Sequence, residues 1–383
     1  MNASALDAPV IAGFVRSPFT LARKGALART RPDDLAAAVI RGLVTRLGLD
    51  PALIEDVVMG CAMPEGEQGL NIGRLAGLLA DLPITVAGMT VNRFCGSSME
   101  AVHIAAGRIP LGAGEAFICA GVESMTRVPM MGFNPMPNPT LMKKMPAAYM
   151  SMGETAENVA RRYDIPRRRQ EEFALESHRR AHAAQQAGRF RDEIVPVPTR
   201  AGEVAEDGCI RPDTTLEALA GLKPAFLADG TVTAGTSSPL TDGAAAVFVC
   251  SASFAERHNL TPLARIRAIS VAGCAPEIMG IGPVAATRKV LSRAGIDIKA
   301  LDVVELNEAF ASQALACIDE LGLDGAKVNI DGGAIALGHP LGATGARITG
   351  KAAALLAREG GRYALATQCI GGGQGIATLL EKI

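Results

Sequence analysis

One cysteine of the sequence stands where a strand is expected to turn into a helix. In residues 91–102, VNRFCGSSMEAV, an apolar run that begins at Ile84 ends shortly before Cys95, and Gly96 opens an expected helix. A helix N-terminus presents free backbone N–H groups and the positive end of the helix dipole, so it favours a thiolate and can receive an oxyanion. Cys95 is therefore a candidate nucleophile, and the alternative is a buried cysteine that packs as a small hydrophobic residue.

A histidine and a second cysteine lie in glycine-rich segments toward the end of the sequence. Residues 332–346, GGAIALGHPLGATGA, hold His339 in an apolar loop, which suits proton transfer near neutral pH; the alternative is a hydrogen-bonded core histidine. In residues 369–377, CIGGGQGIA, three successive glycines expose backbone N–H groups close to Cys369. A dinucleotide-binding loop is not indicated, because the G-x-G-x-x-G register and its later acidic partner are missing.

Two polar residues interrupt an apolar passage in residues 304–311, VELNEAFA. Asn307 and Glu308 are either the N-cap of a helix or part of a site. The two cysteines, the histidine and the asparagine all lie at expected strand ends, and α/β sheets build their sites at the ends of strands. This set indicates acyl transfer through a thiol, with a second thiol available for proton transfer.

An internal repeat supplies the elements that would position these residues. Residues 33–58 and 283–304 each read as an amphipathic helix, a glycine break and a short β-branched strand. Each copy continues into a helix of small residues and then an apolar strand, at Gly96–Gly107 and Ala116–Ala120 and again at Gly342–Leu356 and Tyr363–Thr367. Helices alternating with buried strands predict an α/β fold with largely parallel sheets, and the duplication predicts two similar halves packed together.

The sequence changes character between the two copies. Residues 126–150 are rich in methionine and proline and predict an irregular loop, and residues 154–189 predict a charged helical stretch interrupted at Pro166. The basic residues of that stretch are either a solvated surface or charge near a phosphate-bearing ligand. We expect a first half at 1–125 and 244–262, an inserted loop domain at 126–243, and a second half at 263–383.

Composition argues against several classes of protein. The formal net charge is −1, so nothing global favours nucleic acid or an anionic membrane, and an anionic ligand needs a local cluster of positive groups. The eight cysteines include no C-x-x-C pair, which indicates free thiols in a reducing compartment, with neither a disulfide framework nor a metal site. No segment has the roughly 18 consecutive apolar residues of a membrane span, and the N-terminus lacks the features of a signal peptide. We expect a cytoplasmic protein.

Seven motifs are spread along the chain. They are VNRFCGSSMEAV, GVESM at 121–125, MGETAENVA at 152–160, TAGTSSPLTDGAAA at 233–246, NEAF at 307–310, GGAIALGHPLGATGA and CIGGGQGIA. In these motifs and their order the chain resembles the thiolase family over essentially its whole length. The resemblance implies a thiolase fold, with two similar βαβ-type halves in a five-layered α/β/α/β/α core and a loop domain inserted in the first half.

The resemblance also implies a role for each candidate residue. Cys95 would be the nucleophile that holds the acyl group, and His339 would take the proton from Cys95 and from incoming coenzyme A. Cys369 would protonate the departing acetyl-CoA carbanion. Asn307 would hold a water that forms one oxyanion hole with His339, and the N–H groups of Cys95 and Gly371 would form the other.

Coenzyme A is implied as a substrate that the inserted domain binds, and no separate cofactor is expected. By resemblance, Arg211 and Phe226 would lie near the adenine nucleotide, and Ser238 and Met152 along the pantetheine arm. The ordinary alternatives are a surface charge for Arg211, core packing for Phe226 and a turn residue for Ser238. A homodimer or homotetramer is expected.

Details of the motifs favour the degradative branch of the family. Biosynthetic acetoacetyl-CoA thiolases often have histidine before Met-Gly, whereas Ser151 precedes Met152 here. MGIGPVAATRKVL at 279–291 looks more like degradative 3-ketoacyl-CoA thiolases, including thiolase subunits of bacterial fatty-acid oxidation complexes. The resemblance thus implies thiolytic cleavage of 3-ketoacyl-CoA in β-oxidation, with a hydratase/dehydrogenase subunit as a partner to test. Acetoacetyl-CoA synthesis is the nearest alternative.

Two further alternatives lie outside thiolase activity. Decarboxylating ketosynthases share the fold and the nucleophilic cysteine but resemble a Cys-His-His arrangement, whereas this chain has Asn307 and Cys369 beside a single His339. A non-catalytic acyl-CoA- or lipid-binding protein on this scaffold should have lost a reactive residue, and all four are present. The sequence therefore favours thiolase chemistry over both.

Overall fold

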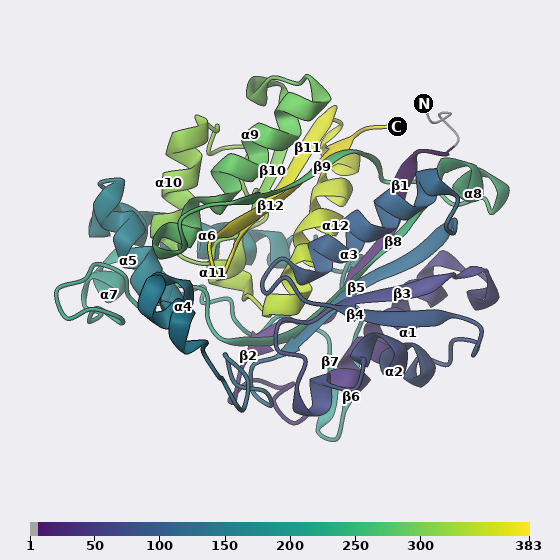
Figure 1. Ribbon diagram of the computed structural model, residues 1–383, viewed down its shortest axis with the longest axis horizontal. Coiled ribbons are helices and arrows are strands. Elements are labelled where there is room, and N and C mark those ends of the chain that lie inside the picture. Colours follow the sequence, from purple (N-terminus) through teal and green to yellow (C-terminus); the bar gives the residue numbers. More distant parts are fainter. Residues whose placement is uncertain (1–6) are drawn as a thin grey trace.

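The chain is built from two copies of one arrangement, seen in a computed structural model that describes residues 7–383 (Figure 1). The first copy contains β1 (Pro9–Arg16), α1 (Pro32–Leu47), β3 (Asp56–Gly60), α2 (Ile72–Leu79), β4 (Ala87–Val91), α3 (Ser97–Arg108), β5 (Ala116–Ser124) and β8 (Thr241–Ser251). The second contains β9 (Ala264–Gly273), α9 (Gly282–Ala294), β10 (Val303–Leu306), α10 (Ala311–Leu321), α11 (Ala334–Leu337), α12 (Leu341–Glu359), β11 (Tyr363–Ile370) and β12 (Gln374–Glu381). The internal repeat predicted from the sequence is confirmed.

The two copies agree even in how their first helices end. Gly48 after α1 and Gly295 after α9 adopt the left-handed conformation, with φ of 59° and 67°. Glycine carries no Cβ penalty there, which makes it the usual residue at this position. Two residues later, Asp50 and Asp297 each accept a hydrogen bond from the backbone N–H two positions further on, at 2.9 Å and 2.8 Å. The same short chain reversal therefore leads into β3 and β10.

The strands follow one hydrogen-bonded order, β10-β11-β12-β9-β1-β8-β5-β3-β4, and β2 (Thr20–Leu21) pairs with β8. The two halves meet in this order only through β1 and β9, at Val10 opposite Arg265 and Ile11 opposite Ala264. Three strand pairs are parallel: β3 with β4, β3 with β5, and β10 with β11. The expectation of largely parallel sheets is wrong, because β8 and β12 return antiparallel beside β5 and β11 and close each half.

Helices cover both faces of each half of the sheet, which gives five layers (Figure 1). On one outer face, Leu35 and Val39 of α1 pack on Phe248. On the other, α9 and α10 bury Val290 and Cys317 against strands of the second half. Between the first and the second half of the sheet lie α3 and α12, side by side at the centre of Figure 1. The expected α/β/α/β/α core is confirmed.

The two central helices touch through their backbones. A Cβ on Gly345 of α12 would overlap the backbone nitrogen of Met99 in α3. Ala346 donates its backbone N–H to Ser98 Oγ at 2.8 Å. A Cβ on Gly121, at the end of β5, would overlap the carbonyl oxygen of Gly342. Small residues at these positions therefore set how closely the two halves approach.

A long excursion separates β5 from β8, at the place where the second half has only the turn 371–373 between β11 and β12. It contains α4 (Pro139–Lys144), α5 (Met152–Arg162), α6 (Arg167–Gln186), the hairpin of β6 (Val197–Thr199) and β7 (Gly202–Val204), and α7 (Leu216–Ala220). After β8, α8 (Ala252–Arg257) leads toward β9. The division at 1–125 and 244–262, 126–243, and 263–383 stays a prediction.

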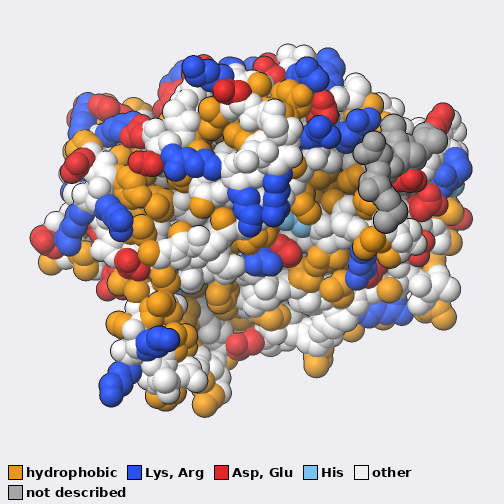
Figure 2. All heavy atoms as spheres, turned by 45° about the horizontal axis from the view of Figure 1, so that its top comes forward, with side chains coloured by type: hydrophobic (Ala, Val, Ile, Leu, Met, Phe, Trp, Pro, Cys, Tyr) orange, Lys and Arg blue, Asp and Glu red, His pale blue; other side chains and the backbone are white. Residues whose placement is uncertain are grey.

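The basic residues of α6 are largely engaged in ion pairs at the surface. Arg168 pairs with Glu172 at 2.8 Å, and Arg169 pairs with Asp319 at 2.6 Å. On the face shown in Figure 2, basic side chains lie interspersed with acidic and apolar ones. These contacts favour the solvated-surface interpretation of the segment. Across residues 7–383, every helix is too short or too polar to cross a membrane.

The backbone contact between α3 and α12 predicts opposite effects for two glycine substitutions. Gly345→Ala should lower the free energy of unfolding by about 1–3 kcal/mol, because its methyl group must displace Met99 and its helix. Gly107→Ala in α3 is the matched control: nothing lies within 4 Å of its Cβ position, so it should raise that free energy by roughly 0.5–1 kcal/mol. Denaturant unfolding measures both, and equal effects would contradict the packing argument.

Candidate active site

Cys95 lies in the short turn between β4 and α3, as the sequence predicts. Phe94 adopts a left-handed conformation, with φ of 45°. The Asn92 side chain supports this turn: it accepts the N–H of Phe94 at 2.8 Å and donates to the carbonyl of Ala62 at 3.0 Å. Gln368 at the end of β11 donates to the carbonyl oxygen of Cys95. Both halves of the molecule thus hold the cysteine from either side.

The surroundings of Cys95 keep its thiol protonated at rest. The residue is 9% exposed. Burial raises the pKa of the Cys95 thiol to about 11, against the opposing effect of hydrogen bonds from the backbone N–H groups of Gly371 and Cys95 itself. The expectation that the helix N-terminus would favour a thiolate is therefore wrong, because desolvation outweighs the N–H groups.

His339 precedes α12 and is held at three of its atoms. Its backbone N–H donates to Thr241 Oγ1 at 3.0 Å, and its Nδ1 lies 2.6 Å from Thr344 Oγ1. The Thr344 hydroxyl donates its one proton to the carbonyl of Pro340 at 3.0 Å, so it can only accept from the imidazole. Nδ1 therefore carries the ring proton. The lone pair at Nε2 faces the amide of Asn307, 3.3 Å away.

The imidazole is neutral as well as oriented. Burial, and after it the positive charge of Arg347, lowers the pKa of His339 to about 3. At neutral pH, Nε2 is consequently an unprotonated nitrogen in a buried site. Such a group can accept a proton from a thiol when negative charge develops on another atom.

Asn307 follows directly after β10 and is fully buried. Its Nδ2 faces His339, and among residues 7–383 its Oδ1 has no hydrogen-bond partner. The neighbouring Glu308 accepts hydrogen bonds from Ser177 Oγ, Asn329 Nδ2 and the N–H of Ile335, at 2.6 Å, 2.8 Å and 3.1 Å. The helix that follows begins at Ala311, so the N-cap interpretation of these two residues is wrong.

Cys369 ends up beside Cys95. It is 1% exposed at the end of β11. Burial raises the pKa of its thiol well above the usual value, and the charge of Cys95 is the next cause. The turn that follows contains Gly372 and Gly373 with φ of 79° and 87°, a conformation that lets Gly371 turn its N–H toward Cys95. The two thiols thus lie close enough for the charge of one to affect the pKa of the other.

Three of the four residues expected along coenzyme A surround this centre. A Cβ on Gly371 would lie 3.5 Å from Met152 Sδ. Phe226 covers the first turn of α5 and meets the ring of Phe310 edge-on, with ring centroids 5.8 Å apart. Ser238 donates through Oγ to the carbonyl of Ala309 at 3.1 Å.

Arg211 sits elsewhere, beside α6. Its backbone N–H donates to Nδ1 of the buried His178 at 3.1 Å, while its side chain is exposed. Among the described residues, its guanidinium makes no hydrogen bond, so it is free to meet a ligand. The structure therefore brings Met152, Phe226 and Ser238 to the reactive centre and places Arg211 on the surface of the inserted segment.

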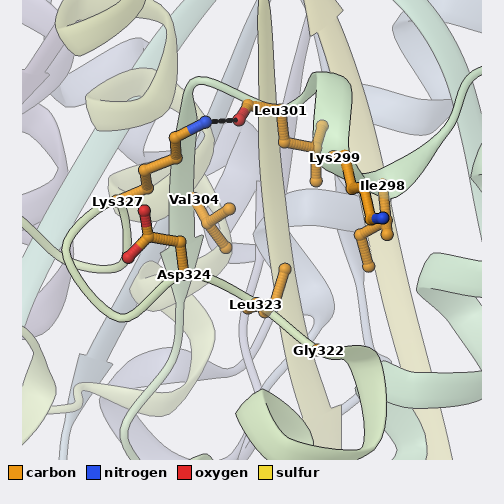
Figure 3. Close-up of a pocket in the computed structure, with 8 residues that line it drawn as sticks. All are labelled: Ile298, Lys299, Leu301, Val304, Gly322, Leu323, Asp324 and Lys327. Atoms are coloured by element: carbon orange, nitrogen blue, oxygen red, sulfur yellow. Dashed lines mark hydrogen bonds between the residues drawn. The ribbon is translucent and has the colours of Figure 1, made fainter.

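One small cavity lies apart from the candidate residues. It has a volume of about 150 Å³ and sits on the outer side of the second half (Figure 3). Its walls are Ile298, Lys299, Leu301, Val304, Gly322, Leu323, Asp324 and Lys327. The Lys327 amine donates to the carbonyl of Leu301, and none of the candidate residues lines the cavity. Within residues 7–383, no cluster of His, Cys, Asp and Glu could hold a metal ion.

Sequence reasoning missed the residues that orient the reactive groups. Thr344 lies in the same motif as His339, and its spacing of five residues would have been a usable signal. Thr241, Asn92 and Gln368 act through contacts between distant segments, which no local pattern reveals.

The sequence matches two family models, the thiolase N-terminal domain over residues 9–253 and the thiolase C-terminal domain over residues 260–382. The chain belongs to the thiolase family. It is 46% identical to a 3-ketoacyl-CoA thiolase of Bacillus subtilis, over 97% of this chain and 98% of the relative. It is 48% identical to a 3-ketoacyl-CoA thiolase of Marinobacter nauticus, over 98% of both chains.

The fold of this thiolase is also similar to a solved structure. The crystal structure of human mitochondrial 3-ketoacyl-CoA thiolase in complex with CoA superposes with a TM-score of 0.90 at 38% sequence identity, and 99% of each chain is covered. The thiolase fold expected from the motifs is thereby confirmed.

The hydrogen bonds of His339 predict a ring that does not titrate near neutrality. Because its pKa is lowered to about 3, the imidazole should stay neutral, with its proton on Nδ1, as the pH falls from 8 to about 5. NMR of the ring nitrogens checks this, with His339→Asn to assign the signals. Thr344→Val should shift the proton toward Nε2. Thr349→Val on the same helix, where the hydroxyl has no partner among the described residues, should leave it in place.

Proposed function

We propose that this thiolase is a 3-ketoacyl-CoA thiolase, an acyltransferase that cleaves 3-ketoacyl-CoA with coenzyme A into acetyl-CoA and a shortened acyl-CoA. Two buried pairs support the proposal: Cys95 with Cys369, whose thiols influence each other, and His339 with Asn307, 3.3 Å apart. The names of the relatives point to the same reaction.

The first half-reaction follows from this arrangement. His339 Nε2 takes the proton of Cys95 as its sulfur attacks the C3 carbonyl of the substrate. The bond between C2 and C3 then breaks, the acyl group stays on Cys95, and the electron pair leaves on the acetyl-CoA enolate. Cys369 donates its thiol proton to C2 and so releases acetyl-CoA. At this point His339 carries the proton from Cys95 and Cys369 is a thiolate, so the proton must pass from His339 to Cys369 to restore two neutral groups.

The second half-reaction uses the same base. Once His339 is neutral again, the thiol of coenzyme A loses its proton to it and attacks the acyl-thioester on Cys95. The Cys95 sulfur leaves and takes that proton back from His339. Negative charge develops on an oxygen in both half-reactions, and two sets of donors suit the two stages. The N–H groups of Cys95 and Gly371 form one set, and His339 forms the other with a water held by Asn307.

Coenzyme A enters as a substrate, and the proposed reaction needs no further cofactor. Met152 and Ser238 would lie along the pantetheine arm, which leads to the sulfur of Cys95. Phe226 and the exposed Arg211 would lie near the adenine nucleotide, where an aromatic face and a guanidinium suit a base and its phosphates.

The degradative branch is favoured over acetoacetyl-CoA synthesis by what Ser151 does. Its hydroxyl accepts the backbone N–H of Glu154 at 3.4 Å, and the Glu154 carboxylate accepts the backbone N–H of Ser151 at 3.3 Å, which closes a capping box at the start of α5. The position that often holds histidine in biosynthetic relatives thus serves as a helix cap here. We further propose a homodimer or homotetramer in the cytoplasm, where eight free thiols are stable, with a hydratase/dehydrogenase subunit as its partner.

Coenzyme A-dependent thiolysis of 3-ketoacyl-CoA substrates of increasing chain length tests the proposal. Turnover should extend beyond acetoacetyl-CoA, with an acyl adduct on Cys95 seen by mass spectrometry of rapidly quenched enzyme. Turnover of acetoacetyl-CoA alone would favour the biosynthetic branch. Tight binding of coenzyme A without turnover or adduct would favour a non-catalytic binding protein.

The two cysteines should separate into distinct roles when each is replaced. Cys95→Ala should abolish both half-reactions. Cys369→Ala should still take an acyl group from an acyl-CoA onto Cys95, because that transfer moves no proton at C2, but should lose about 10²–10⁴-fold in thiolysis of 3-ketoacyl-CoA. Cys250→Ala, in the buried core of the first half, is the control that should keep activity. Undiminished thiolysis in either active-site variant would remove that residue from the mechanism.

A further inference from the structure

The mechanism uses no residue of the GVESM motif, yet that motif contains a buried glutamate. Glu123 is 1% exposed near the end of β5. Its carboxylate accepts four hydrogen bonds from nitrogen donors, the N–H groups of Ala62 (2.8 Å), Met63 (3.2 Å) and Gly342 (2.9 Å) and Gln68 Nε2 (2.7 Å), and a long one from the Cys61 thiol (3.9 Å). Two nitrogen donors meet each oxygen, so the carboxylate is saturated with hydrogen bonds from the protein.

Glu123 and Cys369 stand at equivalent positions in the two copies of the repeat. Val57 of β3 pairs with Ile118, and the equivalent Val303 of β10 pairs with Ala364. Five residues beyond these partners stand Glu123 in the first half and Cys369 in the second. The carboxylate thus occupies, in one half, the position that a reactive thiol occupies in the other.

One side of the carboxylate leads to the nucleophile. Ala62, which donates to Glu123, packs in one cluster with Cys95. The carbonyl of Ala62 accepts from Asn92, whose side-chain oxygen holds the N–H of Phe94 in the turn before Cys95. A continuous chain of contacts therefore runs from Glu123 to the cysteine.

The other side leads to the base. Gly342 lies in the first turn of α12, three residues after His339, and its N–H shares the oxygen Oε2 with the N–H of Ala62. A Cβ on Gly342 would lie 2.6 Å from the carbonyl oxygen of Val122 and 2.9 Å from Glu123 Oε2. One carboxylate oxygen thus ties a loop of the first half to a helix of the second.

We propose that Glu123 is a positioning residue that fixes the separation between Cys95 and His339 by bridging the two halves. The proposal rests on the proposed thiolase function, for which that separation matters. Glu123 makes no hydrogen bond to the thiol of Cys95 among the described residues, so it acts through the loops that it holds. Replacing one oxygen with an amide NH₂ would turn a donor toward backbone N–H groups and push the loops apart.

The test compares Glu123→Gln with the wild-type enzyme. The kcat of thiolysis, calculated per enzyme molecule with a reactive Cys95, should fall on the order of 10²-fold, because a shift of about 1 Å in the reacting groups has an effect of that size. The KM for coenzyme A should stay near its wild-type value. The rate of Cys95 alkylation by iodoacetamide should not fall, because losing the negative charge of Glu123 lowers the pKa of the Cys95 thiol. An unchanged kcat would overturn the proposal. So would a fall in kcat that is accompanied by slower alkylation of Cys95 or by a smaller fraction of enzyme with a reactive Cys95.

Two further measurements keep the proposal open to refutation. Should Glu123→Gln not fold, Gln68→Met removes one of the four nitrogen donors outside the reactive centre, and unchanged kcat in that variant would count against the bridge. A crystal structure of either variant should show a longer distance from Cys95 Sγ to His339 Nε2. An unchanged distance would refute the positioning role. Absence of thiolysis in the wild-type enzyme would refute only the proposed function, because the distance can be measured without activity.

Discussion

The structure depends on the backbone contact between α3 and α12 in the layer that both sheets share. Gly345 and Met99 leave no room for a side chain between the helices, and Gly121 brings β5 equally close to the start of α12. Because the helices begin just after Cys95 and His339, their crossing decides how far apart these two residues lie. The many small residues of the chain serve this close approach, which larger side chains would prevent.

Duplication explains how one chain assembles a site from several loops. Each half presents a helix N-terminus and a strand end at the same place, and the central layer brings the two sets together. The halves have diverged at these equivalent positions: β11 ends in a thiol, whereas β5 ends in a saturated carboxylate. The insertion after β5 then covers the centre with Met152 and Phe226, while the second half closes with a tight glycine turn.

Sequence reasoning predicted the parts of this molecule that local patterns determine. The repeat, the layers and the loop positions of Cys95, His339 and Cys369 follow from periodicity, glycine breaks and motif order. The direction of β8 and β12 did not, because pairing between distant strands leaves no mark on either strand alone. The protonation state of the Cys95 thiol could not be predicted from local patterns either. Desolvation depends on the folded surroundings, and it outweighed the expected effect of the helix N-terminus.

That reversal has a chemical consequence. Burial raises the pKa of Cys95 to about 11 and lowers that of His339 to about 3, so thiol and imidazole are both neutral near pH 7. A neutral pair reacts slowly with stray electrophiles, since the thiolate is the nucleophilic form. The same low-polarity surroundings strengthen the hydrogen bonds from Gly371 and Cys95 to any oxyanion that forms. Ionisation of the thiol is therefore best coupled to attack on a substrate carbonyl carbon whose oxygen those N–H groups already face.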